Sequence, residues 1–255
     1  SDVDDLDHED VSLVRSNLEA VDNWEGELAG CDAVISVAHI KYAPFVIDAC
    51  KKHGVSRVVF FSSTWRFSKV KTPVVASLIQ AEEAIKASGL DYTLLRPTMI
   101  YGPGDDHNIS RLREFIKRRP IMPVFGSGEQ HVQPVFVSDV ARAAVDAVFC
   151  NEAIVQAFEL AGADALTYND MLNTLSESMG RFLLKVHVPI SVGLVLAILG
   201  NRLFSRFPIQ EDQVRRMKED RAFDISEAKK ILEFEPLTFH AGLQASTQLT
   251  GVPGL

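Results

Sequence analysis

Apolar residues along the chain form short continuous runs that alternate with segments of helical spacing. Runs rich in β-branched residues are typical of strands covered on both faces, and helical spacing indicates amphipathic helices. The first part of the chain gives strands at Val11–Val14, Asp32–Ala38, Arg57–Ser62 and Tyr92–Arg96, and helices at Asn17–Gly30, Tyr42–His53 and Val74–Ser88. Strands joined through helices run parallel with right-handed crossovers. The order therefore predicts an α/β fold built on a doubly wound parallel sheet.

The carboxyl ends of these strands define where a ligand is expected. In doubly wound sheets, ligands bind in the crevice beyond those ends, and the binding groups come from the loops there. Three loops therefore form the expected site, and they follow Ala38, Ser62 and Arg96. The residues of these loops are the first candidates for function.

The alternation changes beyond Gly104. The pattern predicts helices at Ile109–Arg119, from Ser138 through Phe149 and at Thr167–Met179, strands at Val132–Val137, Ala157–Leu160 and Leu183–Val188, and two or three helices up to Leu232. Ser138 or Asp139 is the expected N-cap of its helix, and Thr167 is that of another. We divide the chain into an acidic flexible tail (1–10), a main α/β domain (11–150) and a C-terminal lobe interleaved with the main sheet (151–255).

Charge and hydropathy narrow the function classes. The formal net charge is −8, and acidic residues crowd the first ten positions, where a solvated tail is expected. This balance gives no basic face for nucleic acid. The longest apolar run, residues 188–200, is shorter than the ~20 residues of a spanning helix. We expect a buried helix of the C-terminal lobe there, and no transmembrane segment, with a membrane-surface or quinone-site helix as the alternative.

The cysteines and the N-terminus bear on the compartment. Cys31, Cys50 and Cys150 are odd in number and widely spaced, which argues against a disulfide framework and against a zinc site. We expect buried packing for Cys31 and Cys50. The acidic start of the chain has no signal-peptide pattern. These features favour the cytoplasm or another reducing compartment. The run Asp-Asp-His at 105–107 is adjacent rather than spaced, so we expect a solvated loop rather than a metal site.

Four stretches together resemble the extended and atypical branches of the short-chain dehydrogenase/reductase superfamily. They are residues 11–38, 54–63 (GVSRVVFFSS), 89–104 (GLDYTLLRPTMIYGPG) and 124–141 (VFGSGEQHVQPVFVSDVA), with a similar closing segment at 224–243. The order and spacing of these motifs carry the resemblance. NmrA-like and NAD-dependent epimerase/dehydratase-like proteins are the most similar, and the 39-kDa accessory subunits of respiratory complex I are similar more loosely. The resemblance implies a Rossmann-like domain, residues 11–150, that binds NAD or NADP.

One element that the resemblance implies is not found. Family members open with a strand and a G-x-x-G-x-x-G turn, whose backbone N–H groups hold the pyrophosphate. Nothing in residues 1–30 matches that turn, and by alignment the chain begins near the family's third strand. We expect an N-terminal truncation, because a sheet without its central strand exposes a buried edge. Loss of the phosphate grip is the alternative. The residue that distinguishes NAD from NADP is also absent.

The resemblance implies which residues contact the cofactor and the substrate. The expected cofactor contacts are Val37, Ala38, His39, Ser62, Ser63, Pro97, Thr98 and Ile100. Thr64 is the expected hydroxyl that positions a substrate oxygen, and His131 and Gln133 lie in the substrate-facing segment. Ordinary explanations stay open, since Ser and Thr after a strand commonly bond the local backbone. His39 can equally be a loop histidine without a role, and the basic residues of helix 109–119 can form a solvated face rather than meet an acidic group.

The clearest departure from the family lies in the expected catalytic dyad. Family enzymes use Tyr-x-x-x-Lys, in which the tyrosine is the acid/base and the lysine lowers its pKa. Those positions fall at Val74 and Leu78, which can neither transfer a proton nor carry charge. Lys69 and Lys71 precede the helix and could replace the lysine only in part. Dyad-driven hydride transfer or epimerisation is therefore not expected.

Three functional hypotheses remain open from the sequence. The first is an NAD(P)-dependent reductase or epimerase-like enzyme that uses a non-standard acid/base on a small-molecule substrate. The second is a non-catalytic nucleotide-binding scaffold or redox sensor. The third is a chain that, lacking the phosphate loop, binds no dinucleotide. The sequence gives no indication of oligomeric state.

Overall fold

The main layer is a parallel sheet of four strands. A computed structural model describes residues 12–104, 106, 108–203 and 211–250. The strands β1 (Ala33–Ser36), β2 (Arg57–Phe61), β3 (Asp91–Pro97) and β8 (Gln156–Leu160) lie in the order β1-β2-β3-β8, and all pair in parallel. The predicted α/β fold with a parallel, Rossmann-like sheet is therefore confirmed. In the described part of the chain, β1 pairs only with β2.

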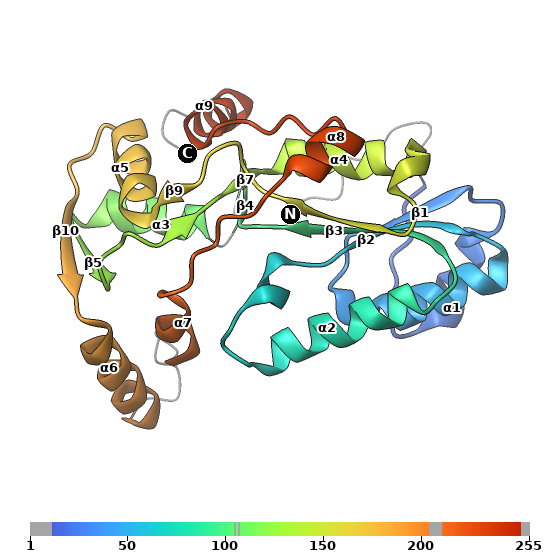
Figure 1. Ribbon diagram of the computed structural model, residues 1–255, viewed down its shortest axis with the longest axis horizontal. Coiled ribbons are helices and arrows are strands. Elements are labelled where there is room, and N and C mark those ends of the chain that lie inside the picture. The colour runs from blue at the N-terminus through green and yellow to red at the C-terminus, as the bar shows by residue number, and fades with distance from the viewer. Residues whose placement is uncertain (1–11, 105, 107, 204–210, 251–255) are drawn as a thin grey trace.

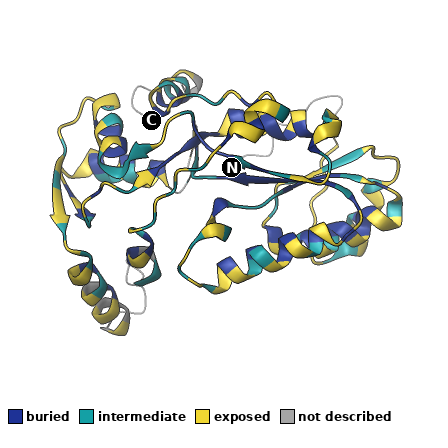
Figure 2. Cartoon of the chain, viewed as in Figure 1, coloured by how far each residue is buried: buried dark blue, intermediate teal, exposed yellow. Residues whose placement is uncertain are grey.

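Helices cover both faces of this sheet, as Figure 1 shows. α1 (Ala43–His53) and α2 (Pro73–Lys86) lie on one face, and α4 (Val137–Phe149) and α8 (Ser226–Ile231) lie on the other. Successive strand side chains alternate between the two apolar cores, so Phe60 packs toward α1 and α2 while Val59 packs toward α4. Figure 2 shows the resulting burial of the central strands.

Strand register brings the three predicted loops to one edge. Ser36 of β1 is paired with Phe60 of β2, and Phe60 is paired with Leu94 of β3. β1, β2 and β3 therefore end close together, and the residues that follow them share the same edge of the sheet. This alignment is what places the candidate site.

A second body interleaves with the first. β10 (Leu184–Val188) pairs in parallel with β5 (Ile121–Phe125), and the helices α3 (Ile109–Arg118), α5 (Tyr168–Ser178) and α9 (Phe239–Thr250) share one core with them. The short strands β4 (Ile100–Tyr101) and β7 (Val135–Phe136) pair with each other and contribute to both cores, and β6 (His131–Val132) pairs with β9 (Leu166–Thr167) in the second core. β8 lies after residue 150, the end of the expected main domain, but it belongs to the main sheet. α3 and β5 lie before residue 150 and pack in the second core.

The apolar run near residue 190 forms a more exposed helix than expected. α6 (Ile190–Leu203) packs beside α7 (Glu211–Arg216) with Ala197 buried, but Val192, Val195, Ile198 and Leu199 are each about half exposed. The expected buried helix is therefore wrong for most of its length, because none of the described residues covers the face that carries these four side chains. Among the described residues, no helix has the length and apolar character needed to cross a membrane.

The N-terminal expectations are also corrected. Residue 11 lies outside the described residues, and residues 12–14 form no strand. The helix expected at Asn17–Gly30 is replaced by two short 3-10 helices, η2 (Val21–Asn23) and η3 (Glu25–Leu28). Asn17 explains part of this, since its side chain accepts a hydrogen bond from the backbone N–H of Glu19 and so favours a turn over a helix.

Three further predictions change in detail. The strand expected at Val132–Val137 is split into β6 and β7 around Pro134, which cannot donate to a ladder. Neither Ser138 nor Asp139 caps α4; its N-cap is Phe136 without a side-chain bond, and buried Asp139 accepts instead from the backbone N–H of Leu237 at 2.9 Å. The Thr167 cap of α5 is confirmed, since its hydroxyl accepts from the backbone N–H of Asp170.

Two residue types behave differently from expectation. Cys31 is exposed because it precedes β1 at the open end of the sheet, whereas Cys50 is fully buried and burial raises the pKa of its thiol to about 11. On α3, Arg113 is buried rather than solvated, and burial lowers the pKa of its guanidinium. The remaining basic residues of α3 and its end are exposed, namely Arg111, Lys117, Arg118 and Arg119.

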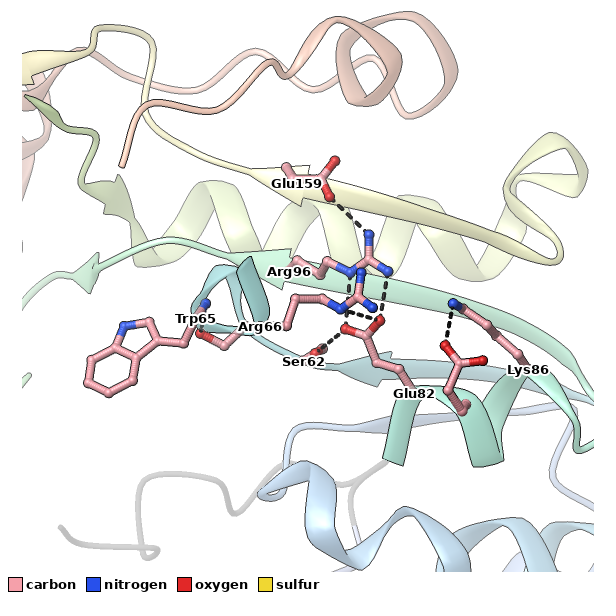
Figure 3. A network of polar contacts seen from close by, with 9 residues as sticks. Ser62, Trp65, Arg66, Glu82, Lys86, Arg96 and Glu159 are labelled. Atoms are coloured by element: carbon pink, nitrogen blue, oxygen red, sulfur yellow. Dashed lines mark hydrogen bonds and ion pairs between the residues drawn. The ribbon is translucent and has the colours of Figure 1, made fainter. Parts of the chain in front are cut away.

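A buried charge network joins α2 to the sheet beneath the site (Figure 3). The fully buried Glu82 carboxylate accepts from Arg96 on β3, through Nε at 3.0 Å and Nη2 at 2.7 Å, and from the Ser62 hydroxyl at 2.5 Å. Arg66 Nε lies 2.9 Å from the same carboxylate, and Arg96 also donates to Glu159 on β8 at 2.9 Å. Burial alone would lower the pKa of Arg96, but the bonds to these carboxylates outweigh it and raise that pKa.

Replacing Glu82 by glutamine should strongly destabilise the fold. Glu82→Gln leaves two guanidinium groups without their buried counter-charge, and we expect the free energy of unfolding to fall by about 3 kcal/mol in urea denaturation. Glu83→Gln is the matched control, because the neighbouring Glu83 pairs only with Lys86 on the exposed face of α2 and should leave the midpoint unchanged. An equal loss in both variants would contradict a stabilising role for the network.

Replacing Gly162 by alanine should also destabilise the fold, for a steric reason. A Cβ at Gly162, just after β8, would lie 2.1 Å from the backbone oxygen of Pro134. Gly162→Ala must therefore displace the β6–β7 segment, and we expect a loss of about 2 kcal/mol in thermal or urea unfolding. Gly26→Ala is the control, since a Cβ at Gly26 meets no atom within 4 Å. If Gly162→Ala unfolded at the same temperature or urea concentration as the parent, the chain at Gly162 and the β6–β7 segment would have to move apart at little cost.

Candidate functional site

The three loops at the carboxyl edge of β1, β2 and β3 enclose a hollow of about 330 Å³, which we call the edge hollow. Most of the cofactor contacts expected from the sequence line it, and it also contains Ile40, Phe61, Trp65, Val74 and Leu78. The expected residues that meet here are Val37, Ala38, His39, Ser62, Ser63, Pro97 and Ile100. Val37 is 74% exposed, so the backbone after β1 is open to a ligand.

Several polar side chains of the edge hollow have local structural roles. His39 Nδ1 accepts from the backbone N–H of Lys41 at 3.2 Å and so caps the 3-10 helix η4 (Ile40–Tyr42). Ser63 caps η5 (Thr64–Phe67) in the same way, and Ser62 donates to buried Glu82. The strand-end cap is therefore the observed role of Ser63. Edge-hollow binding would rely on apolar contacts and backbone groups more than on these side chains.

The two residues that the resemblance places at the positions of a catalytic dyad line the edge hollow, and both are apolar. Val74 and Leu78 lie one turn apart on α2, and both line the hollow. Val74 is 46% exposed, whereas Leu78 is 5% exposed and belongs to the core beneath. Among the residues that line this hollow there is no tyrosine or lysine. The geometry thus presents an apolar wall where a proton donor would be needed.

A larger cavity of about 590 Å³ adjoins the edge hollow, and we call it the main cavity. A volume of this size suits a small organic ligand. Thr64 and Thr98 line it; the Thr64 hydroxyl donates to the carbonyl of Pro97 at 3.3 Å, and the Thr98 hydroxyl donates to the carbonyl of Gln133. The residues shared by the two spaces are Ser62, Ser63, Trp65, Pro97 and Ile100.

The two substrate-side residues expected from the sequence are separated. Gln133 is buried at the wall of the main cavity, where its amide donates to the carbonyl of Gly162 at 2.7 Å and accepts from the backbone N–H of Phe223 at 2.9 Å. His131 lies outside this cavity and beside exposed Asp220, with 3.1 Å between Nδ1 and Oδ1. Hydrogen bonds from His131 lower the pKa of Asp220.

Titratable groups around the main cavity are few. Buried Tyr101 donates its hydroxyl to the carbonyl of Phe239 at 3.2 Å, and burial together with the Asp139 charge raises its pKa above the ordinary value. Asp106 accepts through Oδ1 from the backbone N–H groups of Asn108 and Ser110. Asp105 and His107, from the cluster singled out in the sequence, lie outside the described residues. Tyr101 is thus not set up as a proton donor near neutral pH.

Trp65 and Arg221 were not identified from the sequence. Trp65 lines the edge hollow, the main cavity and a third space of about 400 Å³, which we call the basic hollow. Arg221 lines the main cavity and the basic hollow, and its guanidinium lies 5.6 Å from the centre of the Trp65 ring. No motif marks either residue; only an exposed tryptophan directly after a strand end could have indicated Trp65. Arg221 comes from a segment more than 150 residues away in the sequence.

The described residues fit the nicotinamide side of a dinucleotide better than its phosphate side. The edge hollow has small and apolar residues after β1, which allow close approach of a planar ring. In residues 12–32 of the described chain, no glycine-rich turn leads from a strand into a helix, the arrangement that holds a pyrophosphate. Gly26 and Gly30 belong to the η3 segment and its end instead. Val37, Ala38 and Pro97 would therefore hold the ring end of the cofactor.

Comparison with known proteins identifies the class of this chain. The family model described as NAD(P)H-binding matches residues 1–151. Subunit 9 of the mitochondrial NADH dehydrogenase [ubiquinone] 1 alpha subcomplex from Arabidopsis thaliana is 23% identical over 193 residues, covering 73% of this chain and 48% of the relative. The 3beta-hydroxysteroid-dehydrogenase/decarboxylase isoform 1 of Arabidopsis thaliana is 22% identical, covering 88% of this chain and 62% of the relative.

Solved structures agree on the fold. The dTDP-glucose 4,6-dehydratase of Bacillus anthracis in complex with NAD superposes with a TM-score of 0.74 and 15% sequence identity, covering 98% of this chain and 83% of that one. At this identity the likeness shows the fold alone. The chain spans about half the length of the curated relatives that it matches, between 41% and 62%. With the family model covering more than half of its residues, the chain belongs to the NAD(P)H-binding family of the short-chain dehydrogenase/reductase type.

Proposed function

We propose that the protein binds a nicotinamide dinucleotide along the carboxyl edge of β1, β2 and β3 and retains it without proton transfer by a tyrosine–lysine dyad. The observation that carries the proposal is the apolar wall of the edge hollow, where Val74 and Leu78 occupy the dyad positions. A cofactor held against such a wall stabilises the fold and reports on redox state or partners. The protein does not use it to turn over a substrate in the manner of the family.

Three further observations support nucleotide binding. The family model is one for NAD(P)H binding. The structurally similar dTDP-glucose 4,6-dehydratase has NAD bound, and it shares the parallel sheet on which the edge hollow is built. One relative by sequence is a subunit of a mitochondrial NADH dehydrogenase rather than a free-standing reductase. The choice between NAD and NADP depends on residues outside the edge hollow, and both belong in the tests.

The bound dinucleotide should place its nicotinamide against Val37, Ala38 and Pro97. Ligands of doubly wound sheets bind beyond the strand ends, and these three residues follow β1 and end β3. The exposed backbone at Val37 permits close approach, and the walls exclude water from one face of the ring. The hydrogen bonds of Glu82 to Ser62 and Arg96 hold the ends of β2 and β3 in fixed positions relative to α2. The shape of the hollow is therefore set before a ligand binds.

A charge placed on the wall of the edge hollow should weaken dinucleotide binding. Val74→Glu puts a carboxylate beside a ligand that carries negative phosphates, and we expect the Kd for NADPH or NADH of the full-length protein to rise by about tenfold or more. Val145→Glu is the matched control, because Val145 is exposed to a similar extent on α4 and lines none of the three spaces. NADPH fluorescence titration and the ligand-induced rise in melting temperature measure both variants.

The outcomes of this titration separate the alternatives. Equal affinities of Val74→Glu and Val145→Glu would place the dinucleotide elsewhere. No binding of either nucleotide by the full-length protein would contradict the proposal as a whole.

A second function, a reductase with a different proton donor, is favoured by one observation. The main cavity adjoins the edge hollow and is large enough for a substrate, and the Thr64 hydroxyl lies in its wall within 3.3 Å of the Pro97 carbonyl. Thr64 could orient a carbonyl oxygen there, although its hydroxyl donates to a backbone carbonyl rather than to a titratable side chain. Two curated relatives are named as reductases, a ceramide reductase and a 2-alkyl-3-oxoalkanoate reductase.

Isotope transfer distinguishes the two functions. The full-length protein is mixed with NADPH or NADH deuterated at C4 of the nicotinamide, together with a panel of ketones and aldehydes. Because the dyad positions are apolar, we expect no deuterium in any alcohol product by mass spectrometry above the protein-free background. Deuterium transfer that is lost in Thr64→Val would overturn the non-catalytic proposal and establish the second function.

A further inference from the structure

The main cavity has a mixed lining with a single basic side chain. One wall is apolar, with Pro97, Met99, Ile100, Val132 and Val137, and hydroxyl and amide groups complete the lining. Its one carboxylate, Asp106, accepts from the backbone N–H groups of Asn108 and Ser110. Arg221 is the one lysine or arginine among the residues that line it. An apolar wall with one fixed cation matches a ligand that has a hydrophobic part and one negative group.

Arg221 is held in place by its backbone rather than by a counter-ion. Its N–H donates to the carbonyl of His131 at 2.9 Å, and two residues later the N–H of Phe223 donates to Gln133 at 2.9 Å. Gln133 is itself fixed by Gly162. The segment that carries Arg221 is therefore tied to β6, and Gln133 positions it rather than facing a ligand with a free amide.

The guanidinium of Arg221 differs from its basic neighbours in having no carboxylate partner among the described residues. Arg215 pairs with Glu211 at 2.5 Å, and Arg216 pairs with Asp212 at 2.8 Å while lying 4.5 Å from the centre of the Trp65 ring. The Arg221 guanidinium lies 5.6 Å from the centre of the Trp65 ring, and the charge of Glu219 acts on it without a salt bridge. Burial lowers the pKa of Arg221, yet an arginine stays protonated at neutral pH.

The two carboxylates that directly precede Arg221 in the sequence are both hydrogen-bonded to other groups, and Asp220 is bonded to His131. Glu219 accepts from the Ser68 hydroxyl at 2.9 Å and from the backbone N–H of Lys69 at 2.7 Å, so its oxygens are bound to the loop after η5. Lys69 and Lys218 line the basic hollow on the other side of Trp65. A partly buried arginine without a hydrogen-bonded anion can still bind one. Charge-assisted hydrogen bonds from a guanidinium to oxygen anions are among the strongest that a protein makes.

We propose that Arg221 binds the anionic group of an amphiphilic small molecule, a carboxylate or a phosphate, whose apolar part lies in the main cavity. The site is distinct from the dinucleotide position in the edge hollow and goes beyond nucleotide binding. Trp65 lines both spaces, and the centre of its ring lies 5.6 Å from the Arg221 guanidinium. The two fixed features, one cation and one apolar wall, set the ligand's orientation.

Tryptophan fluorescence provides the binding signal. The chain has two tryptophans, so Trp24→Phe leaves Trp65 as the sole reporter beside Arg221. The probes share an eight-carbon chain and differ in the head group: octanoate, octyl phosphate and neutral 1-octanol. They are titrated into the full-length protein with and without NADPH, and isothermal titration calorimetry of the protein with both tryptophans repeats each measurement independently of the Trp24 substitution.

Loss of the cation should selectively weaken the anionic probes. In Arg221→Gln we expect the Kd of the better anionic probe to rise about 10- to 100-fold, with 1-octanol affected less than twofold. Arg221→Lys should recover part of the affinity because it restores the charge. Arg215→Gln is the matched control, since Arg215 lines the basic hollow but is paired with Glu211, and it should bind all probes as the parent does.

The outcomes are decisive and separable from nucleotide binding. Octanoate binding more tightly than octyl phosphate assigns a carboxylate ligand, and the reverse assigns a phosphate. Equal affinity of the parent for 1-octanol and both anions, or unchanged anion affinity in Arg221→Gln, overturns the inference. NADPH titration of the same variants tests the other proposal, because Arg221 does not line the edge hollow and its substitution should leave NADPH affinity unchanged.

Discussion

The Glu82 carboxylate is the interaction on which the site depends. It lies fully buried on α2, and it binds Arg96 of β3 together with Ser62 and Arg66, which follow β2. A buried carboxylate is tolerated only when its lone pairs are satisfied and its charge is balanced, and here two guanidinium groups and one hydroxyl do both. The loops after β2 and β3 are consequently fixed relative to α2, and the edge hollow and the main cavity take their shapes from that constraint.

The order of elements and the parallel sheet followed from the sequence because apolar periodicity is a local signal that tertiary packing reinforces. The runs at residues 57–62 and 92–96 are buried on both faces, so their patterns were unambiguous. The prediction failed where local signals conflict with context. The side chain of Asn17 favours a turn in a segment that has helical spacing. Pro134 interrupts a predicted strand. α6 exposes apolar side chains that none of the described residues covers.

The site was predictable to the extent that it lies at strand ends. His39, Ser62 and Pro97 meet at one edge because parallel strands that start in register also end together. Residues brought in from afar carry no such signal, and Arg221 reaches the cavity through backbone bonds to β6. Glu82 and Arg96 could have been recognised in the sequence, since each is a charged residue at an otherwise apolar position of α2 or β3. Read as a pair, two such opposite charges indicate a buried bridge.

The indole of Trp65 is a common wall of all three spaces at the carboxyl edge. Because Trp65 lines all three, the position of its side chain enters the shape of more than one compartment. By thermodynamic reciprocity, an effect of one occupant on the affinity of a second would be matched by an equal effect of the second on the first. The shared side chain is the physical link through which such an effect would pass.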